Sequence, residues 1–413
     1  MTGPPAQIRR LTADDDLEPL LDLARRSFGP FGAAAAERRL ADARESIAAG
    51  RHLGAFDGGR LLGAAKFLDM AQWWHGRSLP MAGVANVVVA PEERGRGTGR
   101  ALMNALVTEM GAQGYPLSVL YPATATVYRR VGYELAGAQY QVSMPARSLR
   151  SLLPPDVPAG APPALPALRR VGPDDAAEID AVIGRVHELA RACGPVTFDV
   201  DVSRRQLDDE DLFCYLADDG FLAYTWSGGH REIQIYNMVA GSAATARALW
   251  SVIASHDSMA GTVRAFVGPA DPVSWLTTEP DVSLARRYPW MLRVVDAEAA
   301  IAGRGFPPAA EVAVTLRLGD ELRPANAGLW KLGISDGKGA LQRSRTDPAP
   351  QLPAAGPLAV GPLTLGARGF AALYAGTPVA TLRVAGLAAG GDPAGDAALD
   401  GAFAAAAFML DYF

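Results

Sequence analysis

The chain of 413 residues has little cysteine, no long apolar run and no excess of positive charge. Cys193 and Cys214 are too few for a disulfide framework and lack metal-ligand spacing, so we expect two buried thiols. The net charge of −5 argues against nucleic acid as the main partner. The N-terminus lacks the apolar stretch of a signal peptide, and no run of about 18 apolar residues occurs. We therefore expect a cytoplasmic protein without a membrane partner.

Histidine is scattered along the chain without the spacing of metal ligands. We expect structural or surface roles, and no metal site, for His52, His75, His187, His230 and His256.

Length and composition predict several globular domains. A chain of this length exceeds what one hydrophobic core usually supports, and 49% hydrophobic with 20% charged residues is typical of a folded protein. A segment rich in proline and alanine, 151–167, predicts a linker. We expect domains at 1–150, 168–296 and 297–413.

The first domain alternates helical and strand patterns, typical of an α/β fold. Leucines at 17–23 predict a helix, and Asp57–Gly59 predicts a hairpin turn between the apolar runs 52–56 and 61–68. Residues 85–89 read as a buried strand, and the apolar spacing after residue 98 predicts a helix.

The second domain repeats the pattern of the first. IRRLTADD (8–15) resembles LRRVGPDD (168–175), and TGRALMNAL (98–106) resembles TARALWSVI (245–253). The second copy has AGSAATA where the first has EERGRGTG, so it lacks the glycines and arginines of that loop. We infer one fold used twice, with a second loop that does not bind phosphate.

The last domain has an α+β pattern. Strands are predicted at 312–318 and 329–334, a turn at 336–339, and helices at 366–374 and 397–409. The chain ends on an aromatic residue after an apolar segment, which predicts a packed terminus.

The segment APEERGRGTGRAL, 90–102, admits two interpretations: a solvated turn or a phosphate cradle. Glycines at 95, 97 and 99 allow backbone amides to approach a ligand closely, and the helix start supplies free N–H groups. Arginines at 94, 96 and 100 can pair with phosphate. The spacing matches neither a Walker A loop nor the dinucleotide fingerprint.

NVVVAPEERGRGTGRALM resembles the coenzyme A loop of GNAT N-acetyltransferases, with Arg94, Gly97 and Gly99 on its pattern. The resemblance implies acetyl-CoA as co-substrate, bound by the loop and by the amides of a bulged strand. Ala123 stands where relatives often have a serine. The implied cofactor-binding residues are Val87, Val88, Val89, Arg94, Gly95, Arg96, Gly97, Thr98, Gly99, Arg100 and Ala123.

The whole chain resembles the enhanced intracellular survival (Eis) family. This implies two tandem GNAT-like domains, the second degenerate, followed by a sterol-carrier-protein-like domain. It also implies Tyr128, in TATVYRRVGYE, as general acid and the C-terminal carboxylate of Phe413 as general base. The implied acceptors are polycations such as aminoglycosides, and the implied assembly is a hexamer. Candidate acceptor contacts are Phe28, Asn86 and Asp411.

Acetyl transfer from a thioester to an amine needs a base, a donor to the carbonyl oxygen and an acid for the thiolate. A carboxylate, the amide of Val89 and the hydroxyl of Tyr128 can fill these roles in a direct transfer. Tyr128 as a core residue and Phe413 as an apolar plug remain alternatives. The alternative functions are acetylation of protein lysine or of one metabolite amine, and non-enzymatic binding of coenzyme A or lipid.

Overall fold

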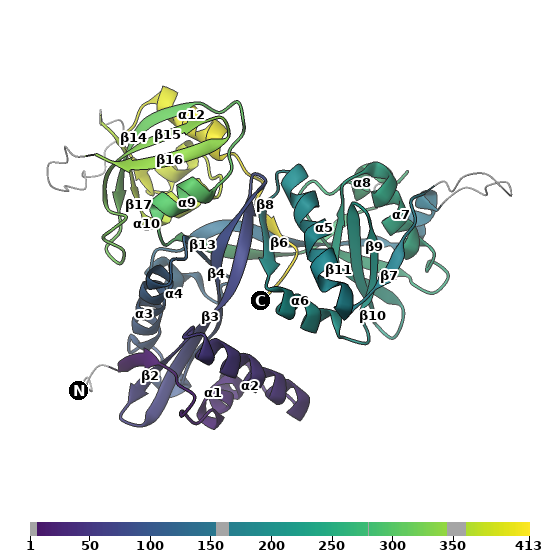
Figure 1. The fold of residues 1–413 in the computed structure, drawn as a ribbon, viewed down its shortest axis with the longest axis horizontal. Helices are drawn as coiled ribbons and strands as arrows, with labels where there is room; N and C mark the ends of the chain where they lie inside the picture. The colour runs from purple at the N-terminus through teal and green to yellow at the C-terminus, as the bar shows by residue number, and fades with distance from the viewer. Residues whose placement is uncertain (1–5, 154–164, 280, 345–360) are drawn as a thin grey trace.

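The structure is a computed structural model that describes residues 6–153, 165–279, 281–344 and 361–413. Its centre is a 14-stranded sheet shared by two α/β units, and a five-stranded sheet forms a third unit (Figure 1). Residues 154–164 of the predicted linker lie outside the described ranges. Within those ranges, no helix is both long and apolar enough to cross a bilayer.

The first unit contains the predicted helices, hairpin and strands. Its hairpin pairs β2 with β3, turning at Asp57, and the leucine-rich helix is α1. The third helix, α3, buries Leu102, Leu106 and Met110 against the sheet because these side chains recur at helical spacing. The elements are β1 (Gln7–Arg10), α1 (Glu18–Phe28), α2 (Ala33–Ala48), β2 (His52–Asp57), β3 (Arg60–Trp74), β4 (Arg77–Val89), α3 (Thr98–Ala112), β5 (Leu117–Leu120), α4 (Ala125–Arg129) and β6 (Glu134–Pro145).

The second unit repeats this order. A short first strand, two helices, a hairpin and a strand–helix–strand segment follow one another as in the first unit, except that a strand at Cys193–Phe198 lies between the two helices and pairs with β3 of the first unit. Its elements are β7 (Arg169–Val171), α5 (Ala176–Leu189), β8 (Cys193–Phe198), α6 (Val200–Leu207), β9 (Phe213–Ala217), β10 (Gly220–Ser227), β11 (Glu232–Ala240), α7 (Ala243–Ala254), β12 (Thr262–Val267), α8 (Val273–Leu276) and β13 (Ser283–Val294).

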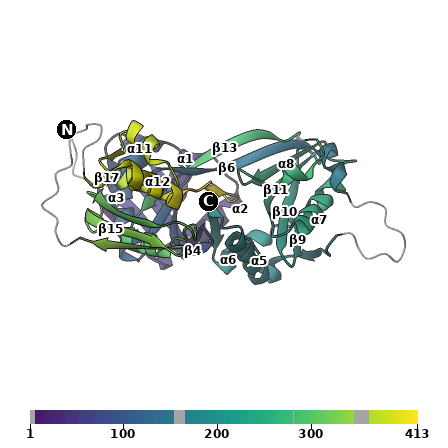
Figure 2. The ribbon, with the colours of Figure 1, turned by 90° about the horizontal axis from the view of Figure 1, so that it is seen from above.

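The two units exchange strands. The order is β1-β2-β3-β4-β5-β13-β6-β12-β11-β10-β9-β7, so β13 lies between β5 and β6, two consecutive strands of the first unit. In turn, β6 pairs with β12 of the second unit. Figure 2 shows β6 and β13 running side by side from one unit to the other. Neither unit completes its sheet with its own strands alone.

The third unit packs helices on a sheet in the order β16-β15-β14-β17-β18. Its buried core is continuous with the far ends of β3, β4 and β13. The elements are α9 (Ala297–Gly303), β14 (Val312–Gly319), β15 (Gly328–Ser335), β16 (Lys338–Arg343), β17 (Leu363–Gly366), α10 (Ala367–Tyr374), α11 (Val379–Val384), β18 (Ala388–Ala389) and α12 (Pro393–Phe403). The last strand, β19 (Phe408–Met409), belongs to the large sheet.

The predicted helix 397–409 is wrong in its second half. The helix α12 ends at Phe403, and the fully buried Arg304 donates to the carbonyl oxygen of Phe403 at 3.3 Å. The chain then leaves the third unit, and β19 pairs in parallel with β6 at Ala138 and Gln139. An alanine-rich apolar stretch has helical propensity, but strand pairing at a distant site overrides it.

Candidate active site

The strands β4 and β5 form a V-shaped opening in the first unit. They pair in parallel only from Met81 to Gly83, after which β4 continues to Val89 without β5 beside it. The side chains of the predicted buried strand 85–89 are mostly half-buried for this reason. A β-bulge interrupts the pairing of β4 with β3 at this place, and Asn86 has the left-handed φ of 52°. A bulge leaves backbone groups unpaired, here at the mouth of the opening.

The glycine loop follows β4 and opens α3. Gly95 and Gly97 have φ of 79° and 91°, which side chains disfavour, and a Cβ at either would meet no atom within 4 Å. Gly97 is the N-cap of α3, and no side chain caps this end. The first N–H groups of α3 therefore have no capping side chain among the described residues, as a phosphate site at a helix N-terminus requires.

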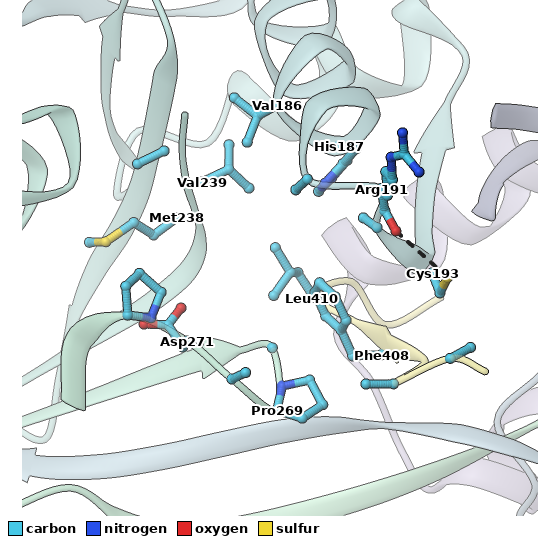
Figure 3. Close-up of a pocket in the computed structure, with 18 of the residues that line it drawn as sticks. Val186, His187, Arg191, Cys193, Met238, Val239, Pro269, Asp271, Phe408 and Leu410 are labelled. Atoms are coloured by element: carbon cyan, nitrogen blue, oxygen red, sulfur yellow. Dashed lines mark hydrogen bonds between the residues drawn. The ribbon is translucent and has the colours of Figure 1, made fainter. Parts of the chain in front are cut away.

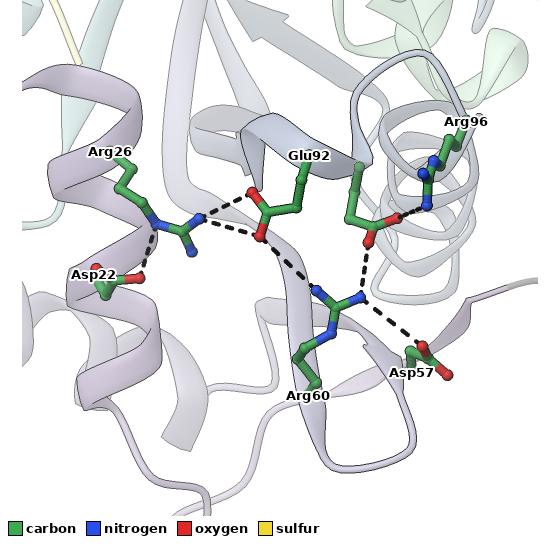
Figure 4. A network of polar contacts seen from close by, with 7 residues as sticks. Asp22, Arg26, Asp57, Arg60, Glu92 and Arg96 are labelled. Carbon is green, nitrogen blue, oxygen red and sulfur yellow. Dashed lines mark hydrogen bonds and ion pairs between the residues drawn. The ribbon is translucent and has the colours of Figure 1, made fainter.

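Ion pairs brace the loop from below (Figure 4). Arg60 of β3 bonds Glu93 at 2.7 Å, and Glu93 holds Arg96 at 3.2 Å. Glu92 accepts from Arg26 of α1 at 3.1 Å. Exposed ion pairs contribute little stability singly, but this network ties the loop to β3 and α1.

The remaining loop residues are positioned as follows. Thr98 is buried under the loop, and Arg94 donates to the carbonyl oxygen of Val89 at 3.3 Å. Arg100 lines a cavity of about 600 Å³ between α3, α4 and the third unit, whose wall also carries other arginines. These are Arg129, Arg130, Arg293 and Arg368. Ala123 is exposed between β5 and α4.

The second unit keeps the opening but not the loop. Its β11 and β12 pair only from Glu232 to Ile235, and β11 carries a bulge at Tyr236. Only residues 241 and 242 connect β11 to α7, and the Ser242 hydroxyl itself accepts from the amide of Thr245 at 3.2 Å. This connection keeps one glycine, Gly241, and lacks the arginines and the other glycines of the first loop, as the sequence predicts.

The corresponding opening of the second unit is an apolar cavity of about 560 Å³. Figure 3 shows Phe408 and Leu410 of the C-terminal segment entering it, with Met238 and Asp271 among the facing residues. Burial raises the pKa of Asp271 to about 6. The wall also contains His187, whose burial lowers its pKa to about 4, so its ring is neutral at pH 7, whereas Asp271 is mostly ionised there.

The C-terminal segment reaches the first unit's opening. Two of its backbone carbonyls are held by side chains, Leu410 by Gln139 at 2.6 Å and Asp411 by the Tyr121 hydroxyl at 2.7 Å. The Phe413 ring lies on Gly83, where β4 and β5 begin to separate, within 2.9 Å of where a Cβ would stand. The packed terminus that the sequence predicts is therefore present.

Tyr121 and Gly83 are residues that sequence reasoning missed. Tyr121 directly follows β5, and its ring lies 4.4 Å from the ring of Tyr412 and 5.7 Å from that of Phe413 between centroids. Its position at the end of a strand was the one indication of a functional residue, but nothing in the sequence shows that the C-terminal residues pack against Tyr121.

Tyr128 lies on the other side of the opening, in α4. It is 7% exposed and packs in the cluster that also holds Val87 and Tyr133. Burial, with Tyr412 nearby, raises the pKa of Tyr128. The phenol thus keeps its proton at neutral pH, which a proton donor needs.

A cavity of about 850 Å³ adjoins the opening and is formed by α2, α6, the β3–β4 hairpin and the chain terminus. Asn86 and Phe413 line it together. Phe28, 53% exposed, lies at its rim, where Arg39 from the cavity wall covers its ring at 5.9 Å. The carboxyl of Asp411, the third candidate acceptor contact, lies instead near Asp180 of α5.

Three family models match the chain: an acetyltransferase (GNAT) domain at 7–136, another at 198–294, and a sterol carrier protein domain at 297–409. A GCN5-related N-acetyltransferase from Kribbella flavida, a solved structure, is 43% identical, with a TM-score of 0.88 over 99% of this chain and 98% of that chain. The chain belongs to the GCN5-related N-acetyltransferases.

Curated relatives narrow this to the Eis type. N-acetyltransferase Eis of Mycobacterium tuberculosis is 28% identical over 302 residues, 69% of this chain and 71% of that protein. An uncharacterized N-acetyltransferase of Streptomyces avermitilis is 29% identical over 356 residues, 80% of this chain and 83% of that protein. The predicted family and the tandem GNAT fold with a sterol-carrier-type domain are confirmed. The protein is an acetyltransferase.

Proposed function

We propose that the first unit transfers an acetyl group from acetyl-CoA to the amine of a small molecule. The observation that carries this is the coincidence of three features at one opening: a bulged strand, an uncapped glycine-rich helix end and the chain terminus. The open glycines and surrounding arginines fit a pyrophosphate. The half-buried end of β4 fits the pantetheine arm, with Val87, Val88 and Val89 supplying backbone groups.

In this proposal the acceptor amine loses a proton to the Phe413 carboxylate, and its lone pair forms a bond to the thioester carbonyl carbon. The amide of Val89 donates to the carbonyl oxygen as charge develops there. The C–S bond breaks, and the Tyr128 hydroxyl gives its proton to the departing thiolate. No covalent enzyme intermediate is needed, since both cysteines are buried and their thiol pKa values are raised.

The charges of the acceptor cavity favour a small amine over a polycation. Its wall carries five cationic side chains, Arg38, Arg39, Arg51, Lys66 and Arg205. Against them stand four acidic ones, Asp42, Glu45, Asp69 and Asp199, together with the terminal carboxylate. A site that selects polycations such as aminoglycosides is expected to be strongly acidic. Of the open alternatives, one specific small amine therefore fits this wall best.

The test is thiol release from acetyl-CoA with aminoglycosides, polyamines, lysine peptides and small amines. Tyr128→Phe is expected to lower kcat by about 100-fold with little change in acetyl-CoA affinity. Extending the chain by three residues beyond Phe413 is expected to lower kcat at least as much. Normal turnover by the extended enzyme would show that the terminal carboxylate is not the base. Silence with every amine, while acetyl-CoA still binds, would favour a binding protein.

Assembly into a hexamer is proposed on the family resemblance alone. Sedimentation of the full chain tests it, and a monomer across a wide concentration range would exclude it.

A further inference from the structure

Lys66 is an unusual charged side chain in the acceptor cavity. It lies in β3, is only 4% exposed, and lines the cavity beside the bulge residue Asn86. Side chains two residues apart on a strand share a face. Lys66 therefore shares its face with Leu68, whose partner across the hairpin, Gly83, carries the Phe413 ring. Lys66 and the chain terminus therefore lie on the same cavity wall, two residues apart along β3.

The ammonium of Lys66 forms no ion pair within the described part of the chain. Two acidic residues of the same cavity are paired elsewhere: Asp69 with Arg51 at 3.0 Å, and Glu45 with Arg205 at 3.0 Å. Both Glu45 and the remaining neighbour, Asp42, are exposed on α2, where solvent screens their attraction.

The residue paired with Lys66 on β2 supplies no negative charge. His52 stands opposite Lys66 in the β2–β3 register and is 2% exposed. Burial and the charge of Lys66 lower the pKa of His52 to about 4, so its ring is neutral at pH 7. Burial also lowers the pKa of Lys66, which Asp42 and Glu45 oppose.

A buried ammonium without a counterion is costly to a fold. The choice of residue adds to the argument, because only three lysines occur among the 39 lysines and arginines of the chain, Lys66, Lys331 and Lys338. The other cationic residues of the cavity wall are arginines. Lysine presents a compact point charge on a flexible stem, which leaves room beside it for a small ligand.

We propose that Lys66 binds an anionic group of the acceptor, a carboxylate or a phosphate, so that the acceptor is a small molecule carrying both the reacting amine and an anion. The inference rests on the proposed function and names the chemical class of its acceptor.

Such an acceptor fits both ends of the cavity wall. Its amine approaches the Phe413 carboxylate while its anion pairs with Lys66. Lys66 lies two residues, or about 7 Å, further along β3. A polycation of the same size would place positive charge against Lys66 and Arg39, which is repulsive in a partly buried site.

The experiment compares acceptors that differ only in the anion. Thiol release by the full-length enzyme is measured with ω-amino acids of three to six carbons and their amides, and with O-phosphoethanolamine and ethanolamine. We expect kcat/KM to be at least about 10-fold higher for the anionic member of a pair. Preference within the acid–amide pairs or within the phosphate pair distinguishes a carboxylate from a phosphate.

In Lys66→Met the ratio of kcat/KM between acid and amide is expected to fall to about 1, and Lys66→Arg is expected to restore part of it. Lys331→Met, at an exposed position of β15, is the matched control and is expected to keep the parent ratio. Melting curves of each variant check that the fold is retained.

Equal use of acid and amide by the parent, an unchanged ratio in Lys66→Met, or faster turnover of aminoglycosides than of every anionic amine would overturn the inference. If no acceptor is turned over, the proposed function fails separately. The binding of 4-aminobutyrate and of its amide to the coenzyme A-loaded protein is then measured by calorimetry. Tighter binding of the acid, with this preference lost in Lys66→Met, supports the anion site. Equal binding of acid and amide refutes it.

Discussion

The two GNAT units of this chain share a framework and differ at the connection between the bulged strand and the helix that follows it. Each has a bulged strand that separates from a parallel neighbour and is followed by a helix. In the first unit, the helix end is Gly97 and lacks a side-chain cap; in the second, the Ser242 side chain occupies it. The fold supplies the opening in both units, whereas only the first unit has the uncapped helix end that the proposed anion site requires.

The C-terminal segment joins the two openings. Phe408 packs on Gly268 at the end of β12, with ring atoms 3.3 to 3.5 Å from where a Cβ would stand. Five residues later, Phe413 packs on Gly83 beside the other opening. One short segment therefore lines the apolar cavity of the second unit and places its last residue, Phe413, beside the opening of the first.

The loop difference predicts the largest effect. Gly97→Asp is expected to weaken acetyl-CoA binding at least about 100-fold, because φ of 91° disfavours a side chain and the carboxylate repels phosphate. Ser242→Asp makes the same charge change at the matching helix end, where aspartate also caps well. Calorimetry should find that Ser242→Asp binds acetyl-CoA with the affinity of the parent. Equal losses of affinity in both variants would contradict the assignment of the loop.

The docking of the terminus predicts an intermediate effect. In Gly83→Ala the new methyl group meets Met70 and the Phe413 ring, so the terminal carboxylate moves. A displacement of about 1 Å can cost 100-fold in rate, and we expect kcat to fall by about 10- to 100-fold with acetyl-CoA affinity retained. Gly401→Ala, on the exposed side of α12 with no neighbour within 4 Å, is the control. Parent-like kcat in Gly83→Ala would argue that the terminus does no chemistry.

The smallest expected effect is on the pH dependence of stability. It concerns Asp411, in the C-terminal segment that joins the two openings. Burial, reinforced by Asp180, raises the pKa of Asp411 to about 7. The unfolded carboxyl ionises near pH 4, so the folded chain holds an extra proton between about pH 4 and 7, and stability falls as pH rises through this window. Asp411→Asn lacks this penalty, so its free energy of unfolding should exceed that of the parent by about 2 kcal/mol at pH 8. This value is reduced because the side chain is partly exposed. No gain is expected at pH 4.

Thermal unfolding across this pH range measures the difference. Asp392→Asn is the control, because its carboxylate caps α12 and asparagine caps equally well. A gain in Asp411→Asn that does not vary with pH would mean that the carboxyl is not the titrating group.

Much of the fold was predictable from local patterns. The leucine spacing of α1, the Asp57–Gly59 turn and the repeat of Thr98–Leu106 at Thr245–Ile253 each depend on near neighbours along the chain. The helix predicted to 409 failed because the chain leaves the helical conformation after Phe403, and Phe408 and Met409 pair with β6, far away in sequence. The roles of the individual site residues, including Tyr128 and Phe413, stay predictions.

The sequence by itself determined the repeat, the loss of the second loop and the family, because glycines, arginines and apolar periods are readable without contacts. Only the tertiary structure decided that β13 enters between β5 and β6, that Phe413 lies on Gly83, and that Lys66 is buried with no ion pair among the described residues. These facts depend on pairings between segments far apart in the chain, and local patterns of residues do not encode which distant strand, ring or charge will be the partner.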